Sequence, residues 1–208
     1  MICFVSGTNT DIGKTFINIE LNKALMTKGL KIASLKPIET GVEIIPKDAL
    51  LHSNNQSEKK DIKEVCFYTF SLPSAPFIAD KDNTIDLEYL KKAIKKSKKD
   101  CDILMIEGAG GLFVPIKKDY FFIDLIKDLG AFCILISDDR LGCISSLLSA
   151  REILENREID FISITNMFNK SNFLEISYPF LRHLEQHFIY QMQRDEIANF
   201  LIQKSQKN

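Results

Sequence analysis

Short apolar segments alternate with longer amphipathic segments along most of this 208-residue chain. The apolar segments are typical of strands buried on both faces, and they cover Ile2–Ser6, Lys31–Lys36, Asp102–Ile106, Phe132–Ser137 and Ile159–Thr165. Apolar residues at helical spacing predict helices over Lys14–Lys28, Leu87–Lys99 and Cys143–Asn156. Strands joined by such long crossovers favour parallel pairing. The expected fold class is therefore α/β, with an open, mainly parallel β-sheet flanked by helices on both faces.

The composition is that of an ordinary globular chain, with 45% hydrophobic and 26% charged residues, and we expect residues 1–208 to form a single domain. The periodicity fails between Thr40 and Thr84, where prolines and the polar run His52–Ser57 predict loops and a short helix. We interpret residues 40–84 as an insertion beside the active site, because ligands bind at the carboxyl ends of parallel strands. Residues 188–208 are interpreted as a short tail whose end, residues 204–208, frays.

The charge balance disfavours whole classes of partner. The chain carries 27 basic and 28 acidic side chains, so it has no overall field that would attract nucleic acid or an anionic membrane. No apolar run approaches the roughly 20 residues of a membrane span, and no basic leader precedes Ile2, so we expect a cytoplasmic protein. The lysines of Leu87–Lys99 lie opposite its apolar face, which predicts a solvated surface. The five cysteines form no C-x-x-C pair, so we expect buried, reduced thiols rather than nucleophiles.

The most informative motif is Ser6–Thr15, which leaves the first predicted strand and opens the first predicted helix. Backbone N–H groups of such a turn cradle phosphate oxygens, Lys14 can reach the β- and γ-phosphates, and the Thr15 hydroxyl can bind magnesium. Thr8 stands where the standard pattern has glycine, and Gly7 lies one residue earlier, so the loop is a variant. The alternative is a glycine-rich turn with a solvent-exposed lysine. The motif refines the expected fold to a P-loop NTPase-like domain, with nucleotide-binding residues Thr8, Asn9, Thr10, Asp11, Ile12, Gly13, Lys14 and Thr15.

Charged residues at other strand ends add to this site. Lys36 follows the second strand, so it should emerge at the same sheet edge and stabilise charge that develops during phosphoryl transfer, although such a lysine is often only a solvated terminus. Glu107 ends the central strand and precedes a flexible turn, as a magnesium-binding acid would. On spacing alone, Asp48 is equally well a second ligand or a solvated loop acid. His183 and His187 are interpreted as surface histidines because no third metal ligand is evident.

Four blocks together resemble one family, the dethiobiotin synthetases: Gly7–Thr15, Lys36–Gly41, Glu107–Gly111 and Leu141–Ile144. The resemblance covers about residues 1–166. It implies a homodimeric ligase of biotin biosynthesis with a shared active site. Such enzymes convert 7,8-diaminononanoate, carbon dioxide or bicarbonate, and a nucleoside triphosphate into dethiobiotin. The reaction runs through a carbamate and a carbamic-phosphoric anhydride, with Mg²⁺ as cofactor and ATP as co-substrate.

The resemblance also assigns roles to single residues. It implies that Lys36 is the main catalytic residue, assisted by Lys14 and Thr10, and that Thr15, Asp48 and Glu107 bind Mg²⁺. Residues assigned to the substrate or carbamate are Lys36, Thr40, Gly110, Gly142, Cys143, Ile144, Ser145 and Tyr178. Of these, the helix start at Gly142–Ser145 and Tyr178 would come from the partner subunit, with helix packing as the alternative role of Tyr178.

The expected base pocket departs from the family pattern. Asn166 matches a base-contacting asparagine, but Met167 replaces a polar residue, and Tyr190–Gln193 stands where relatives carry a Gly-x-Ile-Pro segment. We therefore predict weak nucleotide affinity or a relaxed base preference, with GTP or CTP as alternatives to ATP.

Rival interpretations remain at this point. The main rival is a P-loop nucleotide-switch ATPase of the partitioning or cell-division type, which would need a second lysine where Thr8 and Asn9 stand. A binding module without turnover would not need Lys14, Thr15, Lys36 and Glu107 together. An amidotransferase-type ligase of corrin synthesis would need a glutaminase domain, for which this chain is too short.

Overall fold

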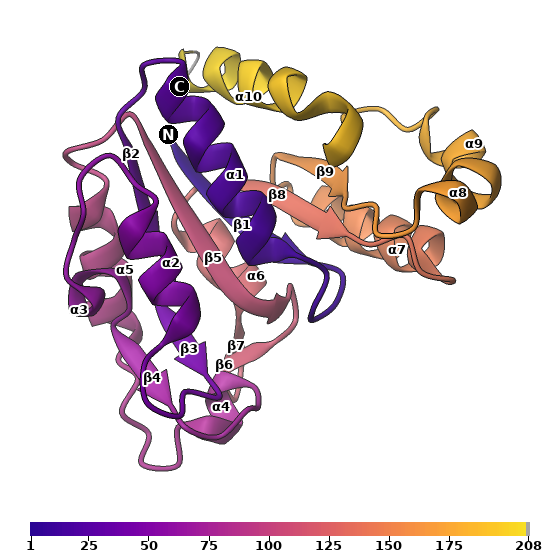
Figure 1. Ribbon diagram of the computed structural model, residues 1–208. Coiled ribbons are helices and arrows are strands. Elements are labelled where there is room, and N and C mark those ends of the chain that lie inside the picture. Colours follow the sequence, from indigo (N-terminus) through magenta and orange to yellow (C-terminus); the bar gives the residue numbers. More distant parts are fainter. Residues whose placement is uncertain (207–208) are drawn as a thin grey trace.

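The computed structural model describes residues 1–206, whose central feature is a six-stranded sheet in which every neighbouring pair is parallel (Figure 1). The strand order is β10-β9-β8-β1-β5-β2. These strands are β1 (Ile2–Gly7), β2 (Ile32–Leu35), β5 (Ile103–Gly111), β8 (Phe132–Ser137), β9 (Phe161–Thr165) and β10 (His187–Ile189). The predicted α/β fold with an open parallel sheet is confirmed, and each of the predicted strands belongs to this sheet.

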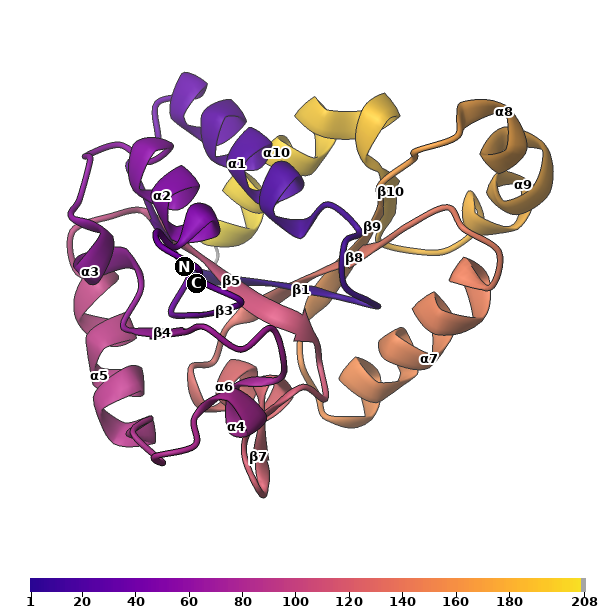
Figure 2. The same ribbon diagram turned by 60° about the horizontal axis from the view of Figure 1, so that its bottom comes forward.

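Helices cover both faces of the sheet (Figure 2). One face carries α1 (Lys14–Thr27) and α10 (Tyr190–Gln206), with α2 (Lys47–Asn54) beside α1. The other carries α5 (Leu87–Ser97), α6 (Phe122–Asp128) and α7 (Cys143–Asn156). Side chains along β1 alternate between the two layers: Val5 packs in the core that includes Ile17 of α1, and Phe4 packs in the core that includes Phe122 of α6. Burial on both faces explains why these strands are almost continuously apolar.

Residues 40–84 are more ordered than the sequence indicated. They contain α2, α3 (Ile62–Val65), β4 (Tyr68–Phe70) and α4 (Pro76–Ala79), and β4 pairs in parallel with β3 (Ile38–Thr40). Asp48, expected in a loop, lies in the first turn of α2. A separate antiparallel pair, β6 (Pro115–Lys117) and β7 (Tyr120–Phe121), follows β5.

The C-terminal segment is a strand and a helix rather than a fraying tail. After β9 the chain passes through α8 (Lys170–Asn172), a π-helical turn (Phe173–Ser177) and α9 (Tyr178–Leu181), and then adds β10 to the sheet edge. Helix α10 follows and buries Ile197, Ala198 and Leu201 in the core on the α1 side. This burial holds Lys204–Gln206 in helix, contrary to the fraying expected there. Lys207 and Asn208 lie outside the described residues.

Two further expectations can be compared with the fold. The exposed lysines of α5, which include Lys92, Lys95 and Lys96, lie opposite its buried Leu90 and Ile94, as predicted. Four of the cysteines are buried, and Cys101 is half-buried. Within residues 1–206, no helix combines the length and apolar character needed to cross a bilayer.

Asp80 organises the loop between α4 and α5. Its carboxylate accepts hydrogen bonds from the backbone N–H of Thr84 at 2.6 Å and of Ile85 at 2.9 Å, and it pairs with Lys117 at 3.2 Å. Burial alone would raise the pKa of Asp80, but the N–H groups of Ile85 and Thr84 and the side chains of Thr84 and Lys117 outweigh it and lower the pKa to about 2.

We predict that Asp80→Asn lowers the free energy of unfolding by about 2 kcal/mol at pH 7, because an amide cannot accept all of these bonds. A carboxylate with a depressed folded-state pKa stabilises above its unfolded pKa of 3.8, so the difference from wild type should shrink as pH falls from about 4 to about 2. Urea denaturation at several pH values measures it. The exposed Asp82 provides the control Asp82→Asn, and an equal loss in that variant would contradict the role of Asp80.

Candidate active site

A cavity of about 780 Å³ lies at the carboxyl ends of the central strands. It is lined by the loop before α1, the residues that follow β2, the start of α2, the end of β5 and the segment Pro73–Pro76. Ten of the residues predicted from the sequence therefore line one cavity: Thr10, Asp11, Gly13, Lys14, Thr15, Lys36, Thr40, Asp48, Glu107 and Gly110.

The loop before α1 closes tightly around Lys14. Gly13 has φ +85°, and a side chain there would collide with the Asn166 amide, so this position requires glycine. The Lys14 side chain is buried and its Nζ donates to the carbonyl oxygen of Asn9 at 3.0 Å. Burial lowers the pKa of Lys14, only partly offset by the charge of Glu107. The burial of Lys14 excludes the alternative raised from the sequence, in which Lys14 is a solvent-exposed lysine on a glycine-rich turn.

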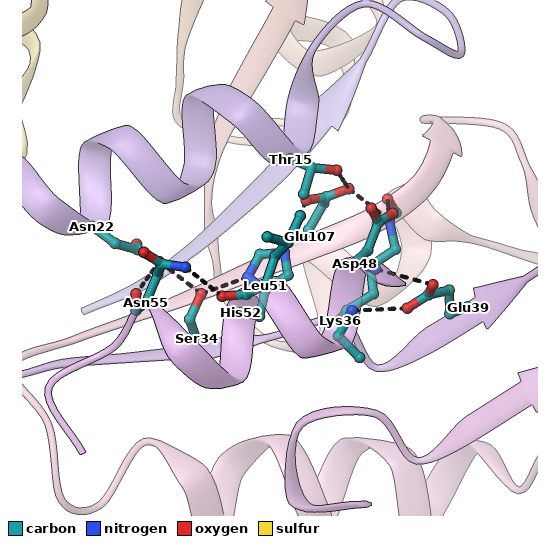
Figure 3. Close-up of polar contacts among 12 residues, drawn as sticks. Thr15, Asn22, Ser34, Lys36, Glu39, Asp48, Leu51, His52, Asn55 and Glu107 are labelled. Atoms are coloured by element: carbon teal, nitrogen blue, oxygen red, sulfur yellow. Dashed lines mark hydrogen bonds and ion pairs between the residues drawn. The ribbon is translucent and has the colours of Figure 1, made fainter. Parts of the chain in front are cut away.

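Lys36 bridges two carboxylates beneath this loop (Figure 3). Its Nζ lies 2.5 Å from Glu107 Oε1 and 3.0 Å from Asp48 Oδ2, and the Lys36 residue is 5% exposed. Burial alone would lower the pKa of Lys36, but the two carboxylates outweigh it and raise the pKa above its usual range. Burial would likewise raise the pKa of Glu107, yet Lys36 and His52 hold it well below its usual range. Both groups are therefore charged at neutral pH.

The oxygen atoms around Lys36 suit a hard cation. The Thr15 hydroxyl donates to Glu107 Oε1 at 2.9 Å, so a hydroxyl and the Glu107 carboxylate already lie together, with Asp48 on the other side of Lys36. Mg²⁺ prefers such oxygen ligands and keeps several positions for water and phosphate. Within the described part of the chain, no cluster of three or more His, Cys, Asp and Glu side chains forms a metal site made by protein alone. The residues fit a cation that arrives with a nucleotide.

Glu39 fixes the start of α2, which carries Asp48. Its carboxylate accepts from the backbone N–H of Asp48 at 3.1 Å and of Ala49 at 2.8 Å. Negative charge is stabilised at a helix N-terminus. Glu39 therefore helps to determine where Asp48 lies, a role that the sequence analysis did not assign to it.

His52 is the main site residue that the sequence analysis missed. Its ring is fully buried, with Nε2 at 2.9 Å from Glu107 Oε2 and Nδ1 at 2.7 Å from Ser34 Oγ (Figure 3). The available signal was its spacing, because a residue four positions after Asp48 shares its helix face.

The other two histidines differ from each other. His183 is exposed, as expected. His187 is half-buried in β10, with its ring nitrogens near the hydroxyls of Ser163 and Thr165, and burial lowers its pKa to about 4. The expectation that His187 lies on the surface is wrong.

Asn166 joins the loop before α1, called the phosphate loop below, to the C-terminal segment. Its Nδ2 donates to the carbonyl oxygen of Ile12 at 3.1 Å, and its Oδ1 accepts from Gln191 Nε2 at 2.7 Å. Gln191 also accepts from the backbone N–H of Met167, while the neighbouring Phe168 borders the cavity with 60% of its surface exposed. Thr8 and Asn9 face a neighbouring hollow that they share with Thr10 and Gly110.

The remaining candidates do not line the main cavity of the same chain. Gly142, with φ +92°, precedes the start of α7, which holds Cys143, Ile144 and Ser145. The Cys143 thiol lies 3.7 Å from the hydroxyl of Ser177, next to Tyr178, so these two candidate segments are neighbours. The preceding Leu141 is fully exposed.

Comparisons with known proteins agree on a nucleotide-binding family. Residues 2–173 match the family described as an AAA domain. A protein of Sulfurovum sp. named ATP-dependent dethiobiotin synthetase is 40% identical over 85% of this chain and 88% of its own length. A protein of the same name from Wolinella succinogenes is 36% identical over 85% of this chain and 86% of its own length. Another from Helicobacter pylori is 32% identical over 96% of this chain and 99% of its own length.

Solved structures support the fold. A plasmid partition protein from Borrelia burgdorferi aligns with a TM-score of 0.60 over 98% of both chains at 13% identity. The MinC:MinD cell division protein complex of Aquifex aeolicus aligns with a TM-score of 0.56 over 90% of this chain and 80% of that chain at 17% identity. At such low identity, these similarities establish the architecture and nothing finer.

We predict that Glu107→Gln lowers the free energy of unfolding by about 3 kcal/mol, because it leaves the buried Lys36 ammonium with Asp48 as its remaining charged partner. Urea denaturation at pH 7 measures the loss. The matched control is Glu58→Gln, which removes the exposed pair of Glu58 with Lys31 at 2.7 Å and should leave the midpoint unchanged. Equal midpoints for wild type and Glu107→Gln would show that the buried pair adds nothing to stability.

Proposed function

Because this chain belongs to the family of ATP-dependent dethiobiotin synthetases, we propose that it catalyses the ring closure that forms dethiobiotin in biotin biosynthesis. Its substrates are 7,8-diaminononanoate, carbon dioxide or bicarbonate, and ATP, and Mg²⁺ is its cofactor. The observation that carries the proposal is the convergence of Lys14 and Lys36 with Thr15, Asp48 and Glu107 on one cavity. That set supplies cations for phosphates and oxygen ligands for a metal, which a ligase driven by phosphoryl transfer needs.

The reaction has three bond-forming steps. One amine adds to carbon dioxide and loses a proton, which gives a carbamate. A carbamate oxygen then attacks the γ-phosphorus of ATP, and the bond from that phosphorus to the bridging oxygen breaks. ADP is the leaving group, and the product is a carbamic-phosphoric anhydride. The second amine attacks the carbamoyl carbon, loses its proton and expels phosphate, which closes the ureido ring.

The barrier of the second step is mainly electrostatic, because an anion attacks a polyanion. Lys14 binds the phosphates. Lys36, whose raised pKa keeps it charged, moves from its carboxylate partners to the transferring phosphoryl group and the carbamate. Thr10 and Thr40 donate hydrogen bonds to the same anions. Thr15, Asp48 and Glu107 would hold Mg²⁺, which would supply further positive charge against the phosphates.

We further propose that the active site is completed by a second copy of this chain in a homodimer. The partner's helix α7 would present backbone N–H groups at Gly142–Ser145 to the far carboxylate of the diamine, and the partner's Tyr178 would reach toward it. Exposure of Leu141 at that helix start is consistent with coverage by another subunit.

Base recognition is proposed to be weak. Gln191 already occupies the Oδ1 atom of Asn166, so a base must displace this bond or bind without it. Phe168 offers an exposed aromatic face, which contacts any base by stacking. ATP would then be the usual substrate, with GTP and CTP also accepted.

The direct test measures phosphate release by the purified protein with Mg²⁺ and bicarbonate, with and without 7,8-diaminononanoate, for ATP, GTP and CTP. We expect release that depends on the diamine, a product with the mass of dethiobiotin, and rates for the three nucleotides within about tenfold of one another, since stacking is tolerant of base identity. Equal slow release without the diamine would instead favour a nucleotide-switch ATPase. Exclusive use of ATP would refute the proposed base tolerance alone.

We predict that Lys36→Ala lowers kcat by about 100-fold or more, equivalent to about 3 kcal/mol of transition-state stabilisation, and changes the Kd for the nucleotide little. The reason is that the Lys36 ammonium acts on charge that develops during the reaction. Lys92→Ala, on the exposed face of α5, is the control. Parallel losses in kcat and nucleotide affinity would make Lys36 a phosphate-binding residue only, and a urea denaturation curve verifies that the variant is folded.

A further inference from the structure

A chain of buried polar side chains ends on Glu107, which lines the cavity (Figure 3). Asn22 of α1 lies 2.9 Å from Ser34 of β2, Ser34 lies 2.7 Å from His52 of α2, and His52 lies 2.9 Å from Glu107 of β5. All four side chains are buried, at 1% exposure or less. Four different elements therefore meet in one hydrogen-bonded chain, of which the reaction described above uses only Glu107.

The direction of this chain follows from its first member. Asn22 Nδ2 also lies 3.2 Å from the backbone carbonyl oxygen of Asn55, which can only accept, so this atom is the amide nitrogen and donates to Ser34 Oγ. The Ser34 O–H can then donate to His52 Nδ1. With Nδ1 as acceptor, the His52 Nε2–H donates to Glu107 Oε2.

The two oxygens of Glu107 have different kinds of partner. Oε1 accepts from Lys36 and Thr15, two groups that leave it in the proposed reaction to contact phosphate and cation. Oε2 accepts from His52, which Ser34 and Asn22 hold in place from behind. In the proposed reaction, His52 would therefore stay bonded to Glu107 while Lys36 and Thr15 move to other partners.

We propose that His52 is a positioning residue that fixes the Glu107 carboxylate for a divalent cation bound with nucleotide. This inference rests on the proposed function only in taking Glu107 as a ligand of that cation. The bond from His52 restricts rotation of the carboxylate, so a free lone pair keeps facing the cavity when Lys36 and Thr15 turn away. Partners behind metal ligands typically change affinity or activity by about 10- to 100-fold when removed.

Helix α2 links this effect to the other carboxylate. Asp48 and His52 lie one turn apart on the same helix, whose start is held by Glu39. One rigid element therefore presents a proposed ligand directly and orients a second ligand through its histidine.

Two substitutions of His52 and one of Ser34 separate positioning from packing. His52→Gln places an amide N–H near the position of Nε2 and keeps a donor for Glu107. His52→Asn reaches only the level of Nδ1, so it keeps a polar group for Ser34 and removes the donor to Glu107. Ser34→Ala leaves His52 in place and removes its anchor. His183→Asn, at the exposed histidine, is the control.

The experiment measures the affinity of Mn²⁺, as a probe for the cation, for each full-length variant saturated with a non-hydrolysable ATP analogue, from the electron paramagnetic resonance signal of free Mn²⁺. We expect His52→Asn to weaken binding by about 10- to 100-fold, His52→Gln to stay within about threefold of wild type, and Ser34→Ala to fall between them. Urea denaturation reports the folding of every variant.

Wild-type affinity in a folded His52→Asn would overturn the inference. Equal weakening in the Gln and Asn variants, or weakening that follows only the loss of stability, would also overturn it. The measurement uses no diamine, so its outcome is separate from the proposed reaction. If the protein did not form dethiobiotin, the Mn²⁺ affinities would still test the role of His52. If it did form dethiobiotin, an unchanged Mn²⁺ affinity in His52→Asn would still contradict that role.

Discussion

The buried ion pair between Lys36 and Glu107 is the interaction on which the site depends. Leu35 of β2 pairs with Ile106 of β5 in parallel register, so the residues that follow them emerge side by side at the same sheet edge. Their charges are 2.5 Å apart and almost fully removed from water. Such a pair is tolerable only when further polar partners complete it, because desolvation costs several kcal/mol for each ion. Asp48 and His52 of α2 are these partners, which explains why a helix must cover this corner of the sheet.

Charge balance then explains how a polyanion can enter a site that is already paired. Lys14 and Lys36 face Asp48 and Glu107, and the carboxylate of Glu39 is taken up by the N-terminus of α2. In the proposed reaction, a triphosphate that arrives with a cation would exchange partners with this set: Lys14 would move to phosphate oxygens, Lys36 to the transferring phosphoryl group and the carbamate, and the carboxylates to the cation. Each buried ion would then keep an oppositely charged partner throughout the proposed exchange, so the internal pairs would not block binding.

The sequence was sufficient where local pattern and tertiary structure carry the same information. Strands buried on both faces are almost continuously apolar, and the glycines of the phosphate loop follow from its backbone geometry, so both could be predicted. His52 could not, because it lies in a polar run typical of loops, and its burial depends on Ser34 and Glu107, which are 18 and 55 residues away. Helix α10 was missed because a few buried residues among many polar ones make a weak pattern, which only packing in the α1 layer completes.

The two halves of the nucleotide site are built from different parts of the chain. Groups that would meet the triphosphate come from β1, β2, β5 and the elements that follow them, and their positions are set by sheet register. Groups near the proposed base position come from the segments after β9 and β10, which meet the phosphate loop through the bonds of Asn166 to Ile12 and Gln191. Substitutions around Gln191 can therefore change base recognition while the Lys36–Glu107 register stays fixed. This separation would allow the proposed base pocket to depart from the family pattern while the proposed catalytic residues keep their positions.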